Sequence, residues 1–139
     1  MTLTDVRANK AVVQRWWEEG YNGRDIPLID ELFAPDYIHH SNDNRLDRQA
    51  FRLAATSFQQ AFPDSRVIIE RLLGEDTFVV MRWRFEGTHT VDTERWGPAT
   101  GRVLTFPSTW ICEVTDGAVQ QDWETWDASG VVQRTRSTE

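Results

Sequence analysis

Residues 77–87 read TFVVMRWRFEG, and large apolar side chains occupy every second position from Val79 onward. Successive side chains of a strand point to opposite faces of its sheet, so this alternation predicts a β-strand with one buried face. The set expected to face the interior comprises Val79, Met81, Trp83 and Phe85. Arg82 and Arg84 belong to the other set, and we expect them to point outward.

Alternation extends on both sides of this stretch, in three further segments: RVIIERLL, RVLTFPSTWICEV and AVQQDWETWD. In the second of these, the uncharged register with the larger aromatics is expected inside and comprises Phe106, Ser108, Trp110 and Cys112. Residues 74–76 and 115–117 have the composition of hairpin turns, which predicts that successive strands are antiparallel. The long connection at residues 89–101 is expected to form a lid or rim.

The residues before this region have helical rather than alternating periodicity. Apolar residues over positions 6–21 predict an amphipathic first helix, and a short second helix is expected after Asp25. A third helix is predicted at residues 47–61 with Asp47 as its cap. Residues 36–41 are expected to be extended and residues 42–47 to form a loop. Helices followed by strands predict a single α+β domain over residues 1–139.

Composition limits the classes of binding partner and the cellular compartment that we expect for this protein. The chain has 22 acidic and 15 basic residues, for a net charge of -7, which disfavours binding to nucleic acid or to anionic membranes. Cys112 is the single cysteine, so no intramolecular disulfide is possible. Because we find neither a signal-peptide pattern nor a membrane-spanning run, we expect a cytoplasmic protein.

The stretch QDWETWD at residues 121–127 has two possible registers. In one, Trp123 faces inward and the acids face solvent, which the cost of burying a carboxylate favours. In the other, Asp122, Glu124 and Trp126 face inward together. Alternation alone does not choose between them.

Four stretches give the chain a wider resemblance: NKAVVQRWWEEGYNGRDIPLIDELFAPDYIHH, AFPDSRVIIERLLGEDTFVVMRWRFEGTHT, PATGR and DGAVQQDWETWDASGVVQ. Together they resemble the SnoaL-like polyketide cyclases of the nuclear-transport-factor-2-like superfamily. The resemblance implies a cone, in which a curved antiparallel sheet wraps around three N-terminal helices and encloses an apolar pocket. It also implies a homodimer and selects the register in which Glu124 faces the pocket.

The chemistry implied by this resemblance is an intramolecular aldol-type closure of a polyketide-like carbonyl substrate, without metal or cofactor. Glu124 falls where the family has an inward-facing acid that serves as general acid/base. We expect Asp122 to tune it, because a dry site and a second acid both favour the neutral form of one carboxyl group. His39, Ser108 or the indole N–H of Trp110 could donate to the oxyanion. The residues expected to bind a small hydrophobic or aromatic substrate are Trp83, Phe85, Phe106, Ser108, Trp110 and Trp126.

Other functions remain open at this point. An epoxide hydrolase of the same superfamily places an arginine between two acids, which here would require Arg84 to face inward. Hydroxylation-type members also exist, and the pocket could belong to a module that only binds a hydrophobic ligand. His39 and His40 are adjacent on a strand and face opposite ways, which disfavours a metal site built from the pair.

Overall fold

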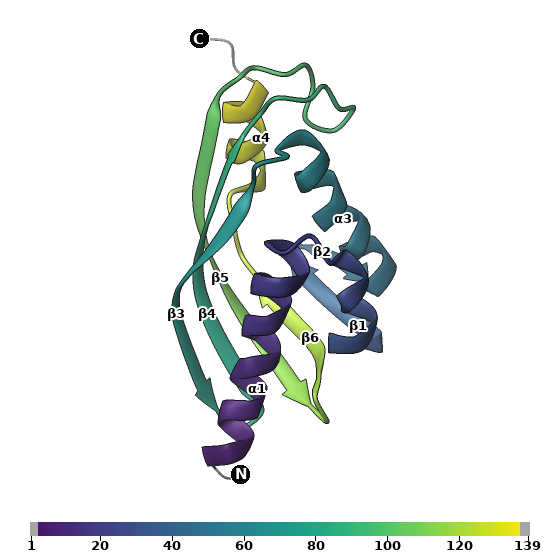
Figure 1. Ribbon diagram of the computed structural model, residues 1–139, viewed down its shortest axis with the longest axis vertical. Helices are drawn as coiled ribbons and strands as arrows, with labels where there is room; N and C mark the ends of the chain where they lie inside the picture. The colour runs from purple at the N-terminus through teal and green to yellow at the C-terminus, as the bar shows by residue number, and fades with distance from the viewer. Residues whose placement is uncertain (1–2, 137–139) are drawn as a thin grey trace.

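The computed structural model describes residues 3–136, in which six strands form one open, curved sheet with the helices packed on its concave side (Figure 1). The strands are β1 (Phe33–Ser41), β2 (Asn44–Asp47), β3 (Arg66–Glu75), β4 (Phe78–Thr88), β5 (Val103–Thr115) and β6 (Ala118–Glu124). Their order across the sheet is β2-β1-β6-β5-β4-β3. The predicted α+β class and the curved sheet around the N-terminal helices are confirmed.

The sheet is mixed, whereas an antiparallel sheet was expected. Strands β3 to β6 are joined by hairpins and pair antiparallel, but β1 pairs parallel with β6. Strand β1 comes from the N-terminal half, and β6 is the last strand of the chain, so their pairing brings together residues more than 80 positions apart. In this register His39 lies opposite Asp122 and Ser41 lies opposite Glu124.

The hairpin between β5 and β6 shows the predicted turn chemistry. Asp116 and Gly117 both have positive φ angles, 53° and 76°, as the two central residues of a type I′ turn require. The turn pairs Thr115 with Ala118, and an irregularity between Glu113 and Val114 then shifts the register by one residue. Beyond it, Trp110 aligns with Glu124 and Cys112 with Asp122. The inward faces expected for β4 and β5 are also confirmed, because both apolar sets are buried.

Helices cover the concave side of the sheet, and the hydrophobic core lies between the two. They are α1 (Leu3–Arg15), the π-helical segment η1 (Trp16–Tyr21), the short 3-10 segment η2 (Ile26–Leu28), α2 (Ile29–Leu32), α3 (Arg48–Ala61) and α4 (Ala128–Arg136). The predicted cap of α3 is confirmed, since Asp47 accepts a hydrogen bond from the backbone N–H of Ala50 at 2.8 Å. None of the helices within residues 3–136 combines the length and apolar content that crossing a membrane requires.

The π-helical segment η1 continues α1 and directs three aromatic side chains inward. Trp16, Trp17 and Tyr21 are all buried. Gly20 makes this packing possible, because a Cβ atom added there would lie 2.3 Å from Cε3 of Trp16. The predicted first helix is therefore present, and its last turns are wider than those of an α-helix.

Two elements differ from the sequence-based expectation. Residues 42–47 were expected to be a loop, but Asn44–Asp47 form the edge strand β2, whose polar side chains suit an exposed edge. The last strand ends at Glu124, and a fourth helix, α4, follows it. Asp127 begins this helix by accepting a hydrogen bond from the backbone N–H of Gly130 at 3.0 Å.

Candidate active site

The register of β6 is the one that buries the acids. Asp122 is fully buried and Glu124 is 8% exposed, whereas Trp123 points outward and stacks on His40 with ring centroids 5.3 Å apart. This confirms the inward register that the family resemblance selected. The alternative with Trp123 inward, which the cost of burying carboxylates would favour, is wrong.

His39 connects the two acids. Its Nδ1 lies 2.5 Å from Oδ1 of Asp122, and its Nε2 lies 3.4 Å from Oε1 of Glu124. The parallel pairing of β1 with β6 produces this arrangement, because it places an inward-facing residue of one strand beside the inward-facing acids of the other. Asp122 was expected to act on Glu124 by direct repulsion, but the structure places His39 between them.

Each acid also has a second donor, which accounts for the burial of two carboxylates. The Tyr37 hydroxyl donates to Oδ2 of Asp122 at 2.7 Å, and the Ser108 hydroxyl donates to Oε2 of Glu124 at 2.6 Å. Buried carboxylates are tolerated when charged or polar partners satisfy their oxygens. Tyr37, His39 and Ser108 therefore hold the two acids in defined positions.

The environment of this cluster raises the pKa of His39, Asp122 and Tyr37. Burial lowers the pKa of His39, but hydrogen bonds and charge from Asp122 and Glu124 outweigh it and raise that pKa to about 9. Burial raises the pKa of Asp122, against the opposing effect of His39 and Tyr37. Burial also raises the pKa of Tyr37 well above its usual value, so its hydroxyl remains a donor. At neutral pH His39 is an imidazolium that donates toward both acids.

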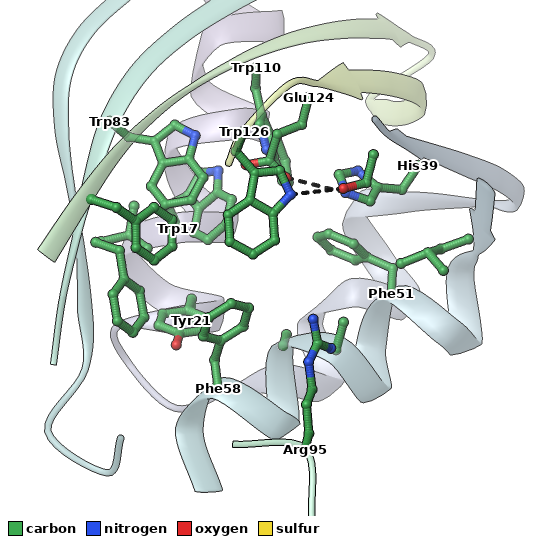
Figure 2. Close-up of a pocket in the computed structure, with 17 residues that line it drawn as sticks. Trp17, Tyr21, His39, Phe51, Phe58, Trp83, Arg95, Trp110, Glu124 and Trp126 are labelled. Atoms are coloured by element: carbon green, nitrogen blue, oxygen red, sulfur yellow. Dashed lines mark hydrogen bonds and ion pairs between the residues drawn. The ribbon is translucent and has the colours of Figure 1, made fainter. Parts of the chain in front are cut away.

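The open side of Glu124 and His39 faces a pocket between the sheet and the helices (Figure 2). Its cavity volume is about 110 Å³. Five of the predicted substrate-binding residues line it: Trp83, Phe85, Phe106, Trp110 and Trp126. Ser108 lies behind Glu124 and supports it rather than forming the wall. Asp122 lies behind His39 and does not reach the pocket.

Aromatic rings form most of the pocket wall and pack closely on one another. Trp17 and Trp83 are stacked with centroids 5.4 Å apart, and Phe106 and Trp126 are stacked at 5.2 Å. The indole N–H of Trp126 donates to the Ser41 hydroxyl at 3.0 Å, which holds that ring at the Glu124 side. Such walls favour a flat, apolar ligand.

Several site residues were not identified from the sequence. Tyr37 precedes His39 by two residues on β1 and so shares its face, a signal that the alternation of the strand contains. Trp17, Phe51 and Phe58 come from helices, where an inward aromatic does not distinguish a pocket wall from a core. Arg95 comes from the loop between β4 and β5, whose course over the pocket is not encoded in a local pattern.

The arginines of β4 lie outside the site. Arg82 and Arg84 project from the outer face of the sheet and form ion pairs with Glu70, at 3.7 and 3.3 Å. The position between the two buried acids belongs to His39. Among the residues that the structure describes, no three His, Cys, Asp or Glu side chains are arranged to hold a metal ion.

Comparison with known proteins places this site in a family. The family model described as SnoaL-like polyketide cyclase matches residues 11–134 of the chain. Among proteins with curated descriptions, none matches.

Solved structures with the same fold include three that span nearly the whole chain. AclR of Streptomyces galilaeus, a proposed hydroxylase, has a TM-score of 0.81 at 22% identity, over 94% of this chain and 96% of its own. A proposed polyketide cyclase of Acidithiobacillus ferrooxidans has a TM-score of 0.80 at 23% identity, with both chains covered completely. A proposed SnoaL-like polyketide cyclase of Jannaschia sp. CCS1 has a TM-score of 0.85 at 18% identity, over 100% of this chain and 98% of its own. At these identities the likeness shows a shared fold.

Proposed function

Because the chain belongs to the SnoaL-like polyketide cyclase family, we propose that it cyclises or isomerises a carbonyl compound with Glu124 as the general base. The observation that carries this proposal is the position of Glu124. One carboxylate oxygen accepts from Ser108 and the other lies 3.4 Å from His39, and the same group forms part of the pocket wall. A base needs this combination of a fixed position and access to substrate.

In this proposal His39 and Asp122 position and balance the base. Asp122 holds the Nδ1 side of His39, so the Nε2 side is directed toward Glu124 and the pocket. Hydrogen bonds and charge from the two acids raise the pKa of His39 to about 9, so His39 is an imidazolium at neutral pH. The imidazolium is therefore available to stabilise negative charge that develops on a substrate oxygen.

The reaction that fits is an aldol-type ring closure. Glu124 removes a proton from a carbon between two carbonyl groups, and the electron pair moves into an enolate beside the His39 imidazolium. The enolate carbon then forms a bond to a distant carbonyl carbon of the same molecule, whose oxygen takes the electron pair. That oxygen recovers the proton from Glu124, so the enzyme returns to its starting state with no net proton transfer.

The aromatic walls contribute by holding the substrate in a folded, reactive position. An apolar cavity of about 150 Å³ holds benzene, so the cavity of about 110 Å³ in this structure corresponds to roughly one ring. A multi-ring substrate requires the walls to move apart. Trp126 follows the end of β6, and a movement of its ring would break its hydrogen bond to Ser41.

The decisive test of this proposal measures proton removal directly. Ethyl benzoylacetate carries one ring and one acidic carbon between two carbonyl groups, and its exchange with deuterium in D2O can be followed by proton NMR. We expect wild-type protein to accelerate this exchange and Glu124→Gln to lose about 100-fold or more of the acceleration, while saturation-transfer NMR still detects the bound probe. Glu113→Gln, which changes a carboxylate on the outer face of the sheet, should leave the rate unchanged.

The same experiment separates the competing functions. If wild type binds the probe without accelerating its exchange, the pocket acts as a binding module. If wild type accelerates exchange and Glu124→Gln is equally fast, Glu124 is not the base. An epoxide hydrolase of the acid–arginine–acid type is not favoured, because Arg82 and Arg84 both lie on the outer face.

A homodimer stays a prediction, supported by the exposed apolar residues Phe78, Ile111 and Trp123 on the outer face of the sheet.

A further inference from the structure

Arg95 reaches the pocket from the side opposite the acids. It lies in the loop between β4 and β5, and its guanidinium points toward the cavity beside Phe58, while Glu124 and His39 lie across the cavity from it (Figure 2). The guanidinium carbon is 5.8 Å from the ring centroid of Phe58 and 5.1 Å from that of Trp96. Stacking on ring faces orients a guanidinium.

The loop that carries Arg95 is held in place. The next residue, Trp96, is fully buried, with its ring 5.0 Å from Phe58 and 5.5 Å from Phe62. Thr93 and Gly97 exchange two backbone hydrogen bonds around this tryptophan, at 3.1 and 2.8 Å. Arg95 is therefore presented from an ordered turn, and little conformational freedom is lost when it binds a ligand.

Charge makes Arg95 distinctive within the pocket. Among the described residues that line it, the basic side chains are those of His39 and Arg95. His39 already lies between Asp122 and Glu124, with a ring nitrogen directed at each of them. The whole chain has a net charge of -7. An anionic ligand would thus be attracted at the Arg95 end, away from Glu124, the acid that lines this pocket among the described residues.

We propose that the substrate carries a carboxylate, that Arg95 binds it at the mouth of the pocket, and that this contact directs the opposite, carbonyl-bearing end toward Glu124. This inference rests on the proposed function, because it names the class and the orientation of the substrate of the same site. Arg95 is a specificity-determining residue here and takes no part in proton transfer.

The test compares ligands that differ in charge but have nearly the same shape. Benzoate and 2-naphthoate are each titrated against the neutral amide, benzamide or 2-naphthamide, by isothermal calorimetry with wild-type protein, Arg95→Gln and Arg95→Lys. Hydrogen bonds to charged groups predict that wild type binds the carboxylate about 10- to 100-fold more tightly than the amide. Arg95→Gln should remove this preference, and Arg95→Lys should keep part of it. Arg82→Gln, a matched change on the outer face, should have no effect.

Three results would overturn the inference: equal affinity for carboxylate and amide in wild type, no detectable binding of either carboxylate, or a preference that survives in Arg95→Gln. Thermal unfolding of each variant shows whether the loop remains folded, and Arg95→Lys tests the charge even if glutamine disturbs the turn. The outcome is separable from that of the proposed function, because the binding ratio is measured without turnover. Equal affinity of wild type for carboxylate and amide, with Glu124-dependent exchange intact, would refute the role of Arg95 alone.

Discussion

Removing the charge of Asp122 tests the link between the two acids most directly. Asp122→Asn retains the size of the side chain and an oxygen that can accept from Tyr37. It removes the carboxylate that lies 2.5 Å from Nδ1 of His39. Burial, which lowers the pKa of His39, is then opposed by Glu124 alone. We therefore expect that pKa to fall from about 9 in wild type toward or below the ordinary value of about 6.5.

The size of the effect on stability follows from the same shift. A pKa raised from 6.5 to about 9 corresponds to about 3 kcal/mol. Because the folded pKa of His39 lies above the unfolded one, this stabilisation is fully present below about pH 6.5 and is lost as pH rises through about 9. Asp122→Asn should lower the free energy of unfolding by up to about 3 kcal/mol at pH 6, and by much less near pH 10.

Two measurements check this prediction. Carbon-13 NMR of the histidine Cε1 atoms follows the titration, with the His39 signal identified by its absence in His39→Gln. Urea unfolding at pH 6, 8 and 10 measures stability in parallel. Asp36→Asn, an exposed carboxylate also carried by a site strand, serves as the control. A wild-type His39 that titrates near 6.5, or a pKa that is the same in Asp122→Asn, would refute the proposed coupling.

Two further predictions concern elements that shape the site. Gly20→Ala should destabilise the fold by about 1–3 kcal/mol, because the new Cβ would lie 2.3 Å from the Trp16 ring; a urea midpoint equal to or above that of wild type would contradict this. Asp47→Ala should cost about 1 kcal/mol through loss of the cap on α3, whereas Asp47→Ser should retain most of it. Equal unfolding midpoints for the two Asp47 variants would show that the cap does not contribute.

The faces of β4 and β5 could be predicted because the signal is local. Each residue of these strands contrasts with its immediate neighbours, and the apolar set is large enough to define the buried side without knowledge of the rest of the chain. The helices α1 and α3 were predictable for a similar reason. Strand β2 and helix α4 were not, because their sequences are polar and their places depend on partners, β1 for the first and the end of the sheet for the second.

The register of β6 shows the limit of local reasoning. By the cost of burying carboxylates alone, Trp123 would be buried and the carboxylates exposed. The groups that make the opposite register stable are Tyr37 and His39, which lie 85 and 83 positions earlier in the chain than Asp122. The family resemblance could choose the register, because the known fold of the family already places an acid on the inner face of the last strand.

The sequence by itself determined the α+β class, the buried faces of the central strands, the aromatic character of the interior and the set of candidate acids. These depend on local periodicity and composition, which do not require knowledge of distant contacts. Only the tertiary structure decided that His39 lies between Asp122 and Glu124, that Ser108 supports Glu124 from behind, and that Arg95 faces them across the pocket. The physical reason is that parallel pairing of β1 with β6 and the course of the loop between β4 and β5 are long-range events. His39, the two acids and Arg95 come together around one pocket only when these segments pack against one another.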